Sequence, residues 1–173
     1  MKIIIKPIGI AANYIIEELN NRLSFTFGSP IEISPEPAIL DLSYNPERDQ
    51  YHASTLLKLI EACSTVRDEK KIAIVDVDLY AQELNYVFGM ADAISGVAVI
   101  SLFRLRQEYY GLPPDNDLFL DRATKEAIHE LGHTFGLEHC SNIKCVMHFS
   151  NSLADTDWKQ SVFCSHCQPR LIK

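Results

Sequence analysis

The sequence predicts an α/β (α+β) fold with a mixed, mostly parallel β-sheet covered by helices. Short β-branched apolar runs alternate with helical patterns over the first hundred residues, as in chains whose parallel strands are joined by helices. Apolar residues make up 47% of the 173 residues, which is enough to build one core. We therefore expect residues 1–173 to form a single domain.

Six short segments are strand candidates because they are apolar, rich in β-branched or aromatic residues, or bracketed by proline and glycine. They are residues 3–10, 31–33, 38–42, 72–77, 86–91 and 97–103. A turn at residues 94–96 separates the last two. Asp76 and Asp78 alternate near the end of the fourth strand, where they are either an acidic metal pair or ordinary strand-end aspartates.

Three segments have helical spacing. Residues 13–23 and 51–63 lie between the strands, and Cys63 is expected on the buried face of the second helix. A proline-containing loop at 111–117 precedes a helix from about residue 121 to about residue 135, which Asp121 or Thr124 could cap. Gly136 ends this helix, since glycine tolerates the left-handed conformation.

The helical period is lost from Leu137 onward. We therefore expect an N-terminal subdomain, residues 1–136, that includes the last helix, and an irregular C-terminal subdomain, residues 137–173. The tail needs something other than a large core to hold it.

Three histidines and a glutamate gather near the end of the predicted helix. His129 and His133 are four residues apart, which places both imidazoles on one helix face. Beyond the turn at Gly136, His139 can supply a third nitrogen. Three imidazoles and one water are the ligand set of a catalytic zinc, and Glu130 beside the first ligand can act as general base. The pattern predicts a zinc-dependent peptidase; the alternative is ordinary helix histidines and a solvated glutamate.

Four of the five cysteines crowd into the tail: Cys140, Cys145, Cys164 and Cys167. Four clustered thiolates indicate a structural zinc, so we expect two zinc ions per chain. A redox Cys-x-x-Cys pair, disulfides, or a mixed site using His148 or His166 are the alternatives. Because Cys140 follows His139 directly, a metal on the cysteines would fix the direction in which His139 points.

Composition limits the classes of partner. The net charge of −7 argues against nucleic acid, and no apolar run is long enough to cross a membrane. The apolar N-terminus is too short and interrupted for a signal peptide, so a cytoplasmic monomer acting on peptides or proteins is expected. Two other functions remain possible from sequence: a two-zinc scaffold with negligible turnover, and a zinc-ribbon-like interaction module in the tail.

The combined pattern resembles the archaemetzincins, a branch of the metzincin zinc peptidases. The resemblance is carried by residues 129–139, the four cysteines, Met147, and residues 149–152 and 163–164. It implies a metzincin-like sheet with an active-site helix, a catalytic zinc on the three histidines, Glu130 as general base and a second zinc on the cysteines. It also implies that Met147 forms the family's Met-turn beneath the catalytic metal. In metzincins an edge strand pairs with the extended substrate, and residues 86–91 are our candidate.

Overall fold

A five-stranded sheet forms the centre of the protein. The computed structural model describes residues 2–9, 13–35, 39–63 and 69–172. The spatial order of the strands is β2 (Ile31–Ile33), β1 (Lys2–Pro7), β5 (Glu69–Val75), β8 (Val97–Ser101) and β7 (Gly89–Asp92). The first four are parallel, whereas β7 lies at the end of the order and runs antiparallel to β8. The predicted mixed, mostly parallel sheet is confirmed.

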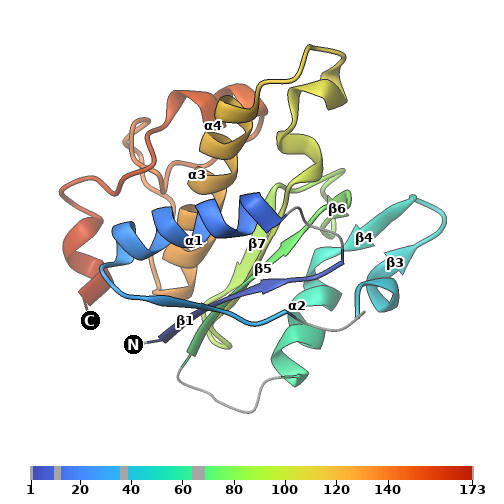
Figure 1. Ribbon diagram of the computed structural model, residues 1–173, viewed down its shortest axis with the longest axis horizontal. Coiled ribbons are helices and arrows are strands. Elements are labelled where there is room, and N and C mark those ends of the chain that lie inside the picture. The colour runs from blue at the N-terminus through green and yellow to red at the C-terminus, as the bar shows by residue number, and fades with distance from the viewer. Residues whose placement is uncertain (1, 10–12, 36–38, 64–68, 173) are drawn as a thin grey trace.

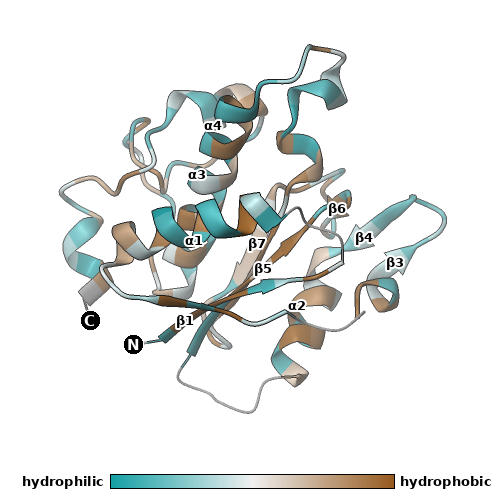
Figure 2. Ribbon diagram, in the orientation of Figure 1, coloured by the Kyte–Doolittle hydropathy of each residue, from teal (hydrophilic) through white to brown (hydrophobic). Residues whose placement is uncertain are grey.

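Helices cover both faces of this sheet (Figure 1). Helices α1 (Asn13–Phe27) and α3 (Asn116–Thr134) lie on one face, and α2 (Ala53–Ala62) lies on the other. Side chains along β5 alternate between two cores: Ile72 and Ile74 join the cluster with α1 and α3, while Ala73 and Val75 join the cluster with α2. Figure 2 shows the hydrophobic character of β5 between these layers.

The remaining elements are short. A second sheet has the order β3 (Tyr44–Asn45), β4 (Gln50–His52) and β6 (Leu79–Tyr80). The others are the 3-10 helices η1 (Leu40–Ser43), η2 (Phe103–Leu105), η3 (Gln107–Tyr110) and η4 (Gln168–Ile172), and helix α4 (Leu153–Trp158). Within the described ranges, none of the helices has both the length and the apolar character that crossing a membrane requires.

The tail after α3 packs back along that helix, and α4 reaches Arg122 in the N-terminal half of α3 (Figure 1). Between residues 137 and 172, α4 and η4 are the regular elements that interrupt the irregular course of the tail. Val146, Met147 and Phe163 are buried in the same cluster as α3, so the tail packs on the main core through a few apolar anchors.

Several sequence predictions were wrong in detail. The strand expected at 38–42 is instead the 3-10 helix η1 from Leu40, with residue 38 outside the described ranges. The helix expected from residue 51 begins at Ala53, because residues 50–52 pair as β4. Cys63 follows the last residue of α2 and is exposed, so it does not lie on the buried helix face.

The sequence analysis also predicted the start of α3 too late in the chain, at about residue 121. The helix begins at Asn116, and neither Asp121 nor Thr124 caps it. The cap is Asp115, whose side chain accepts a 2.9 Å hydrogen bond from the Leu118 N–H. Asp121 instead pairs with Lys125 one turn later, at 2.6 Å.

Candidate active site

The C-terminal end of α3 positions the histidines. Gly136 has φ +80° and its N–H donates to the His133 carbonyl, while the Leu137 N–H donates to the Gly132 carbonyl. These two bonds form a Schellman turn, which reverses the chain as predicted for Gly136. The turn leaves the Leu137 carbonyl 2.7 Å from His133 Nδ1 and sends the chain back toward His139.

The structure brings the three predicted histidine ligands together. One ring nitrogen from each of His129, His133 and His139 lies within 4.8 Å of the other two. The Nε2 atoms of His129 and His133 are 3.1 Å apart, close to the roughly 3.3 Å edge of a tetrahedron with Zn–N bonds of about 2.0 Å. His139 is exposed, so the cluster is open to solvent on that side.

Hydrogen bonds and burial prepare these imidazoles for a metal. His129 Nδ1 contacts the Val146 carbonyl at 2.8 Å and His133 Nδ1 contacts the Leu137 carbonyl, which directs both Nε2 atoms into the cluster. Burial lowers the pKa of all three histidines, that of His129 well below its ordinary value. Neutral imidazoles with free Nε2 lone pairs are what zinc requires, so the cluster fits the metal.

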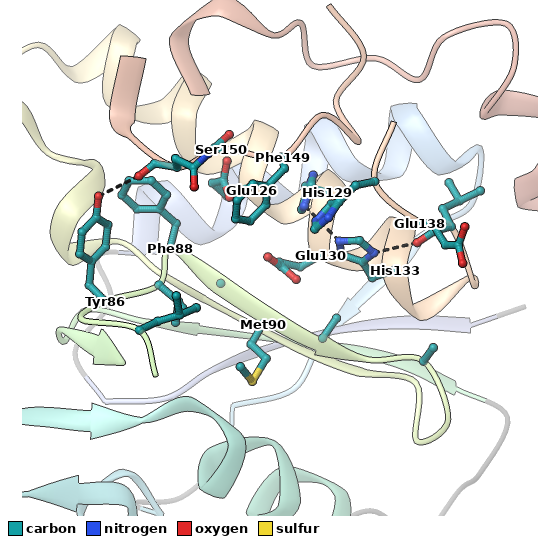
Figure 3. Close-up of a pocket in the computed structure, with 18 of the residues that line it drawn as sticks. Tyr86, Phe88, Met90, Glu126, His129, Glu130, His133, Glu138, Phe149 and Ser150 are labelled. Carbon is teal, nitrogen blue, oxygen red and sulfur yellow. Dashed lines mark hydrogen bonds between the residues drawn. The ribbon is translucent and has the colours of Figure 1, made fainter. Parts of the chain in front are cut away.

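Glu130 lies beside the histidines in a confined position. Its carboxylate reaches into the cleft in front of the histidine pair (Figure 3). Burial raises the pKa of Glu130 well above its ordinary value, and the Glu126 carboxylate one turn earlier raises it further. Gly89 of β7 faces it so closely that a Cβ there would lie 2.6 Å from Glu130 Cγ.

The four tail cysteines form a second cluster. Their sulfur atoms lie within 4.8 Å of one another, and all five cysteines of the chain are free thiols. The Cys140 and Cys164 sulfurs are 3.8 Å apart, which equals the roughly 3.8 Å edge of a tetrahedral site with Zn–S bonds of about 2.3 Å. A backbone N–H bond from Cys167 lowers the pKa of Cys164 to about 6, which favours the thiolate at that sulfur, whereas burial raises the pKa of Cys145 and of Cys167. The cluster therefore fits a structural zinc.

The histidines offered as substitute ligands lie outside that cluster. His166 is exposed, and His148 Nδ1 contacts the Cys140 carbonyl at 2.9 Å. Asp76 and Asp78 each face an arginine: Arg104 holds Asp78 through two 2.6 Å hydrogen bonds, and Arg106 holds Asp76. The two aspartates therefore serve as ion-pair partners.

Met147 lies directly behind the active-site helix. It is fully buried, and a Cβ added to Gly132 would overlap its sulfur. The Cys140 N–H donates to the Met147 carbonyl at 2.9 Å, which ties the residue after His139 to the methionine segment. Gly132 is the helix position that admits this close packing.

A cleft of about 800 Å³ runs past both Glu130 and the histidines. One wall is the segment 84–91, which includes the start of the edge strand β7, and the other is the segment 149–151 after the methionine. Figure 3 shows Tyr86, Phe88 and Met90 on the strand side and Phe149 and Ser150 on the opposite side. The strand predicted at 86–91 begins at Gly89, and it does lie at the sheet edge.

One buried group near the site escaped sequence reasoning. The Lys159 ammonium is completely buried and lies 2.9 Å from Glu126 Oε1, which also accepts a 3.1 Å hydrogen bond from Thr156. Lys159 also donates to the His148 carbonyl at 3.4 Å. No local sequence signal marks this set, because its members lie about 30 residues apart.

A histidine cluster beside a buried carboxylate, in a cleft bordered by an open strand edge, defines a metallopeptidase site. The model of Peptidase family M54 matches residues 36–173. The archaemetzincin of Methanocaldococcus jannaschii is 43% identical over 99% of this chain and 93% of its own length. That of Pyrococcus furiosus is 44% identical over 98% and 91%.

Solved structures support the same family assignment as the sequence matches. A crystal structure of archaemetzincin from Archaeoglobus fulgidus, complexed with malonate, matches with a TM-score of 0.85 at 35% identity over 98% of this chain and 99% of that one. A zinc-dependent peptidase from Methanocorpusculum labreanum matches with a TM-score of 0.89 at 28% identity over 98% and 99%. The chain therefore belongs to peptidase family M54 and is a zinc metallopeptidase.

Proposed function

We propose that the protein hydrolyses peptide bonds in peptide or protein substrates, with zinc held by His129, His133 and His139 and with Glu130 as general base. The observation that carries this proposal is the convergence of three ring nitrogens within 4.8 Å beside a buried carboxylate. The open side at His139 leaves room for water and substrate.

Zinc and Glu130 would have separate roles in the reaction. When bound, zinc polarises the scissile carbonyl and lowers the pKa of a coordinated water. Glu130 takes the proton from the attacking water and delivers it to the leaving nitrogen, so no covalent enzyme intermediate is needed. Burial favours this role, because a carboxyl group whose pKa is raised is a stronger base once ionised.

We propose that the substrate binds in extended form along the outer edge of β7. The strand ends the sheet order and borders the cleft, so its outer backbone groups can pair with a peptide. Gly89 would then lie opposite the scissile bond, next to Glu130.

The second zinc, on the four cysteines, has a structural role in this proposal. It would order the tail, and through Cys140 it would fix the backbone of His139. Met147 would form the Met-turn, a hydrophobic support behind the ligand helix at Gly132.

Cleavage of a mixed peptide library, analysed by mass spectrometry, tests the function. The native protein is compared with Glu130→Gln, which keeps the size of the side chain but removes the base, at equal zinc content. The matched control is Glu61→Gln, an exposed glutamate of α2 on the opposite face of the sheet.

The proposal requires cleavage by the native protein and by Glu61→Gln, with loss of cleavage in Glu130→Gln. Cleavage by Glu130→Gln at the native rate would contradict the role of Glu130. If none of the three cleaves any peptide while zinc is bound, the two-zinc scaffold without turnover becomes the better account.

A further inference from the structure

One side chain crosses the cleft from wall to wall. The Tyr86 hydroxyl, on the strand side, donates a 3.1 Å hydrogen bond to the Asn151 carbonyl on the opposite wall. Both residues line the cleft, and Figure 3 shows Tyr86 rising from the sheet edge at the end farther from the histidines. This contact joins two segments 65 residues apart in the chain.

The Tyr86 ring is held from behind by a charged and aromatic stack. The Arg104 guanidinium lies 4.4 Å from the centre of the Tyr86 ring and 4.9 Å from that of Tyr109. Arg104 is itself fixed by its two hydrogen bonds to Asp78. Phe88 adds an edge contact at 5.4 Å. A half-buried tyrosine with these partners has little freedom to swing out of the cleft.

The spacing between the bridge and Glu130 limits how many substrate residues fit between the bridge and the scissile bond. Gly89 touches Glu130, and Tyr86 is three residues before it on the same segment. Residues 86–88 precede β7 and include a bend at Phe88, so this stretch spans no more than about 10 Å. At about 3.3 Å per residue, an extended peptide therefore has room for at most about three residues between the scissile bond and the bridge.

We propose that the Tyr86–Asn151 bridge blocks the substrate cleft near one end, two residues before the lining ends at Leu84, so that the enzyme favours bonds within about three residues of one chain terminus. This inference rests on the proposed peptidase function and on pairing of the substrate with β7. Tyr86 is a specificity-determining residue in this account and takes no part in bond cleavage.

The test uses peptides built around one bond that the native protein cleaves. The chain is lengthened one residue at a time, first on the amino side and then on the carboxyl side, and kcat/KM is measured for each peptide. Native protein, Tyr86→Ala and Tyr86→Phe are compared. Tyr109→Ala is the matched control, because it removes the other ring on Arg104 and does not line the cleft.

For the native protein and for Tyr109→Ala, kcat/KM should fall once the chain passes about three residues on one side, and that side identifies the terminus at the bridge. For each protein, kcat/KM of the long peptides is divided by that of the short ones. In Tyr86→Ala this ratio should be at least about tenfold higher than in the native protein, because a steric barrier has been removed. Tyr86→Phe, which keeps the ring and loses the bond to Asn151, should show a smaller gain.

Equal rates for all lengths in the native protein, or an unchanged length limit in both Tyr86 variants, would overturn the inference while leaving the peptidase function intact. If no peptide is cleaved, calorimetric affinities of alanine-based peptides for zinc-loaded Glu130→Gln and for its Tyr86→Ala double variant give the same comparison without turnover. Affinity that is independent of length in both proteins would then overturn it.

Discussion

Two glycines permit the closest approaches in the site. Gly132 lies on α3 between the two helical histidines, where Met147 and Phe163 fill the space that a side chain would need. Gly89 lies on the edge strand, where Glu130 fills that space. Both contacts join segments far apart in the chain, so each glycine allows close packing beside the histidine cluster and Glu130.

Replacing Gly132 with alanine tests the first approach. Helix propensity alone favours alanine by about 1 kcal/mol, but overlap with Met147 and Phe163 costs about 1–3 kcal/mol in a packed core. We expect a net loss of unfolding free energy, measured by denaturant titration. In the double variant with Met147→Ala the two losses should not add, because the clash has been removed. Additive losses would mean that the two residues do not interact.

Replacing Gly89 with alanine tests the second approach. The new Cβ would displace the Glu130 side chain, and a misplacement of about 1 Å in a catalytic group costs on the order of a hundredfold in rate. We expect kcat to fall while zinc content stays at the native level, as measured by atomic absorption. An unchanged kcat would show that Glu130 need not occupy the position seen here.

At the scale of elements, the site is assembled where α3 meets the tail. The Val146 carbonyl orients His129, and the buried Lys159–Glu126 pair links the segment after α4 to the middle of α3. Thr156 of α4 completes the hydrogen bonding of Glu126. The tail is thus part of the active-site framework although it contains little regular structure.

Lys159→Met should destabilise the protein by about 3–5 kcal/mol, because it leaves the buried Glu126 carboxylate without its cation. Lys58→Met, at an exposed position of α2, should change stability by less than about 0.5 kcal/mol. Thermal or denaturant unfolding measures both. Adding Glu126→Gln to Lys159→Met should recover part of the loss; a double variant as unstable as the sum of the singles would show that the pair is not coupled.

Cys164→Ser should lose one zinc ion per chain and disorder the tail, since the four-sulfur site no longer closes. The catalytic zinc should also become easier to remove with a chelator, because Cys140 neighbours His139. Cys63→Ser, which alters an exposed thiol outside the cluster, is the control and should keep the native zinc content. Native resistance of the catalytic zinc in Cys164→Ser would argue against this coupling.

The parts of the site that the sequence predicted are local in the chain. The four-residue histidine spacing, the turn at Gly136 and the Cys-x-x-Cys pair each follow from geometry within a few residues. The strand-helix alternation likewise predicted the layers of the fold. Where a short apolar run met a turn, as at Leu40–Ser43, periodicity could not distinguish a strand from a 3-10 helix.

The parts that sequence missed depend on distant partners. Gly89 packs against Glu130 of another element, and Lys159 pairs with Glu126, which is 33 residues earlier in the chain. Neither contact produces a periodic pattern in the sequence. The start of α3 was missed because the acidic residues at 115, 117 and 121 are equally plausible caps from composition alone. The structure selects Asp115, through a local hydrogen bond from the Leu118 N–H.

At the scale of the whole molecule, the central sheet and the C-terminal tail form the two sides of the cleft. The active-site helix lies between them, so the cleft runs between β7 on one side and residues 149–151 on the other. The sheet core is apolar on both faces; the core on the α2 side contains no residue of either metal cluster, whereas the core on the α3 side includes Cys145 and Cys167. A chelator should therefore abolish peptide cleavage before it unfolds the sheet.

Anomalous diffraction at the zinc absorption edge, on a preparation that also cleaves peptides, tests the central claim most directly. We predict two zinc ions per chain, one bound to His129, His133 and His139 and one bound to the four cysteines. Peptide cleavage by a preparation whose histidine cluster contains no zinc would contradict this account.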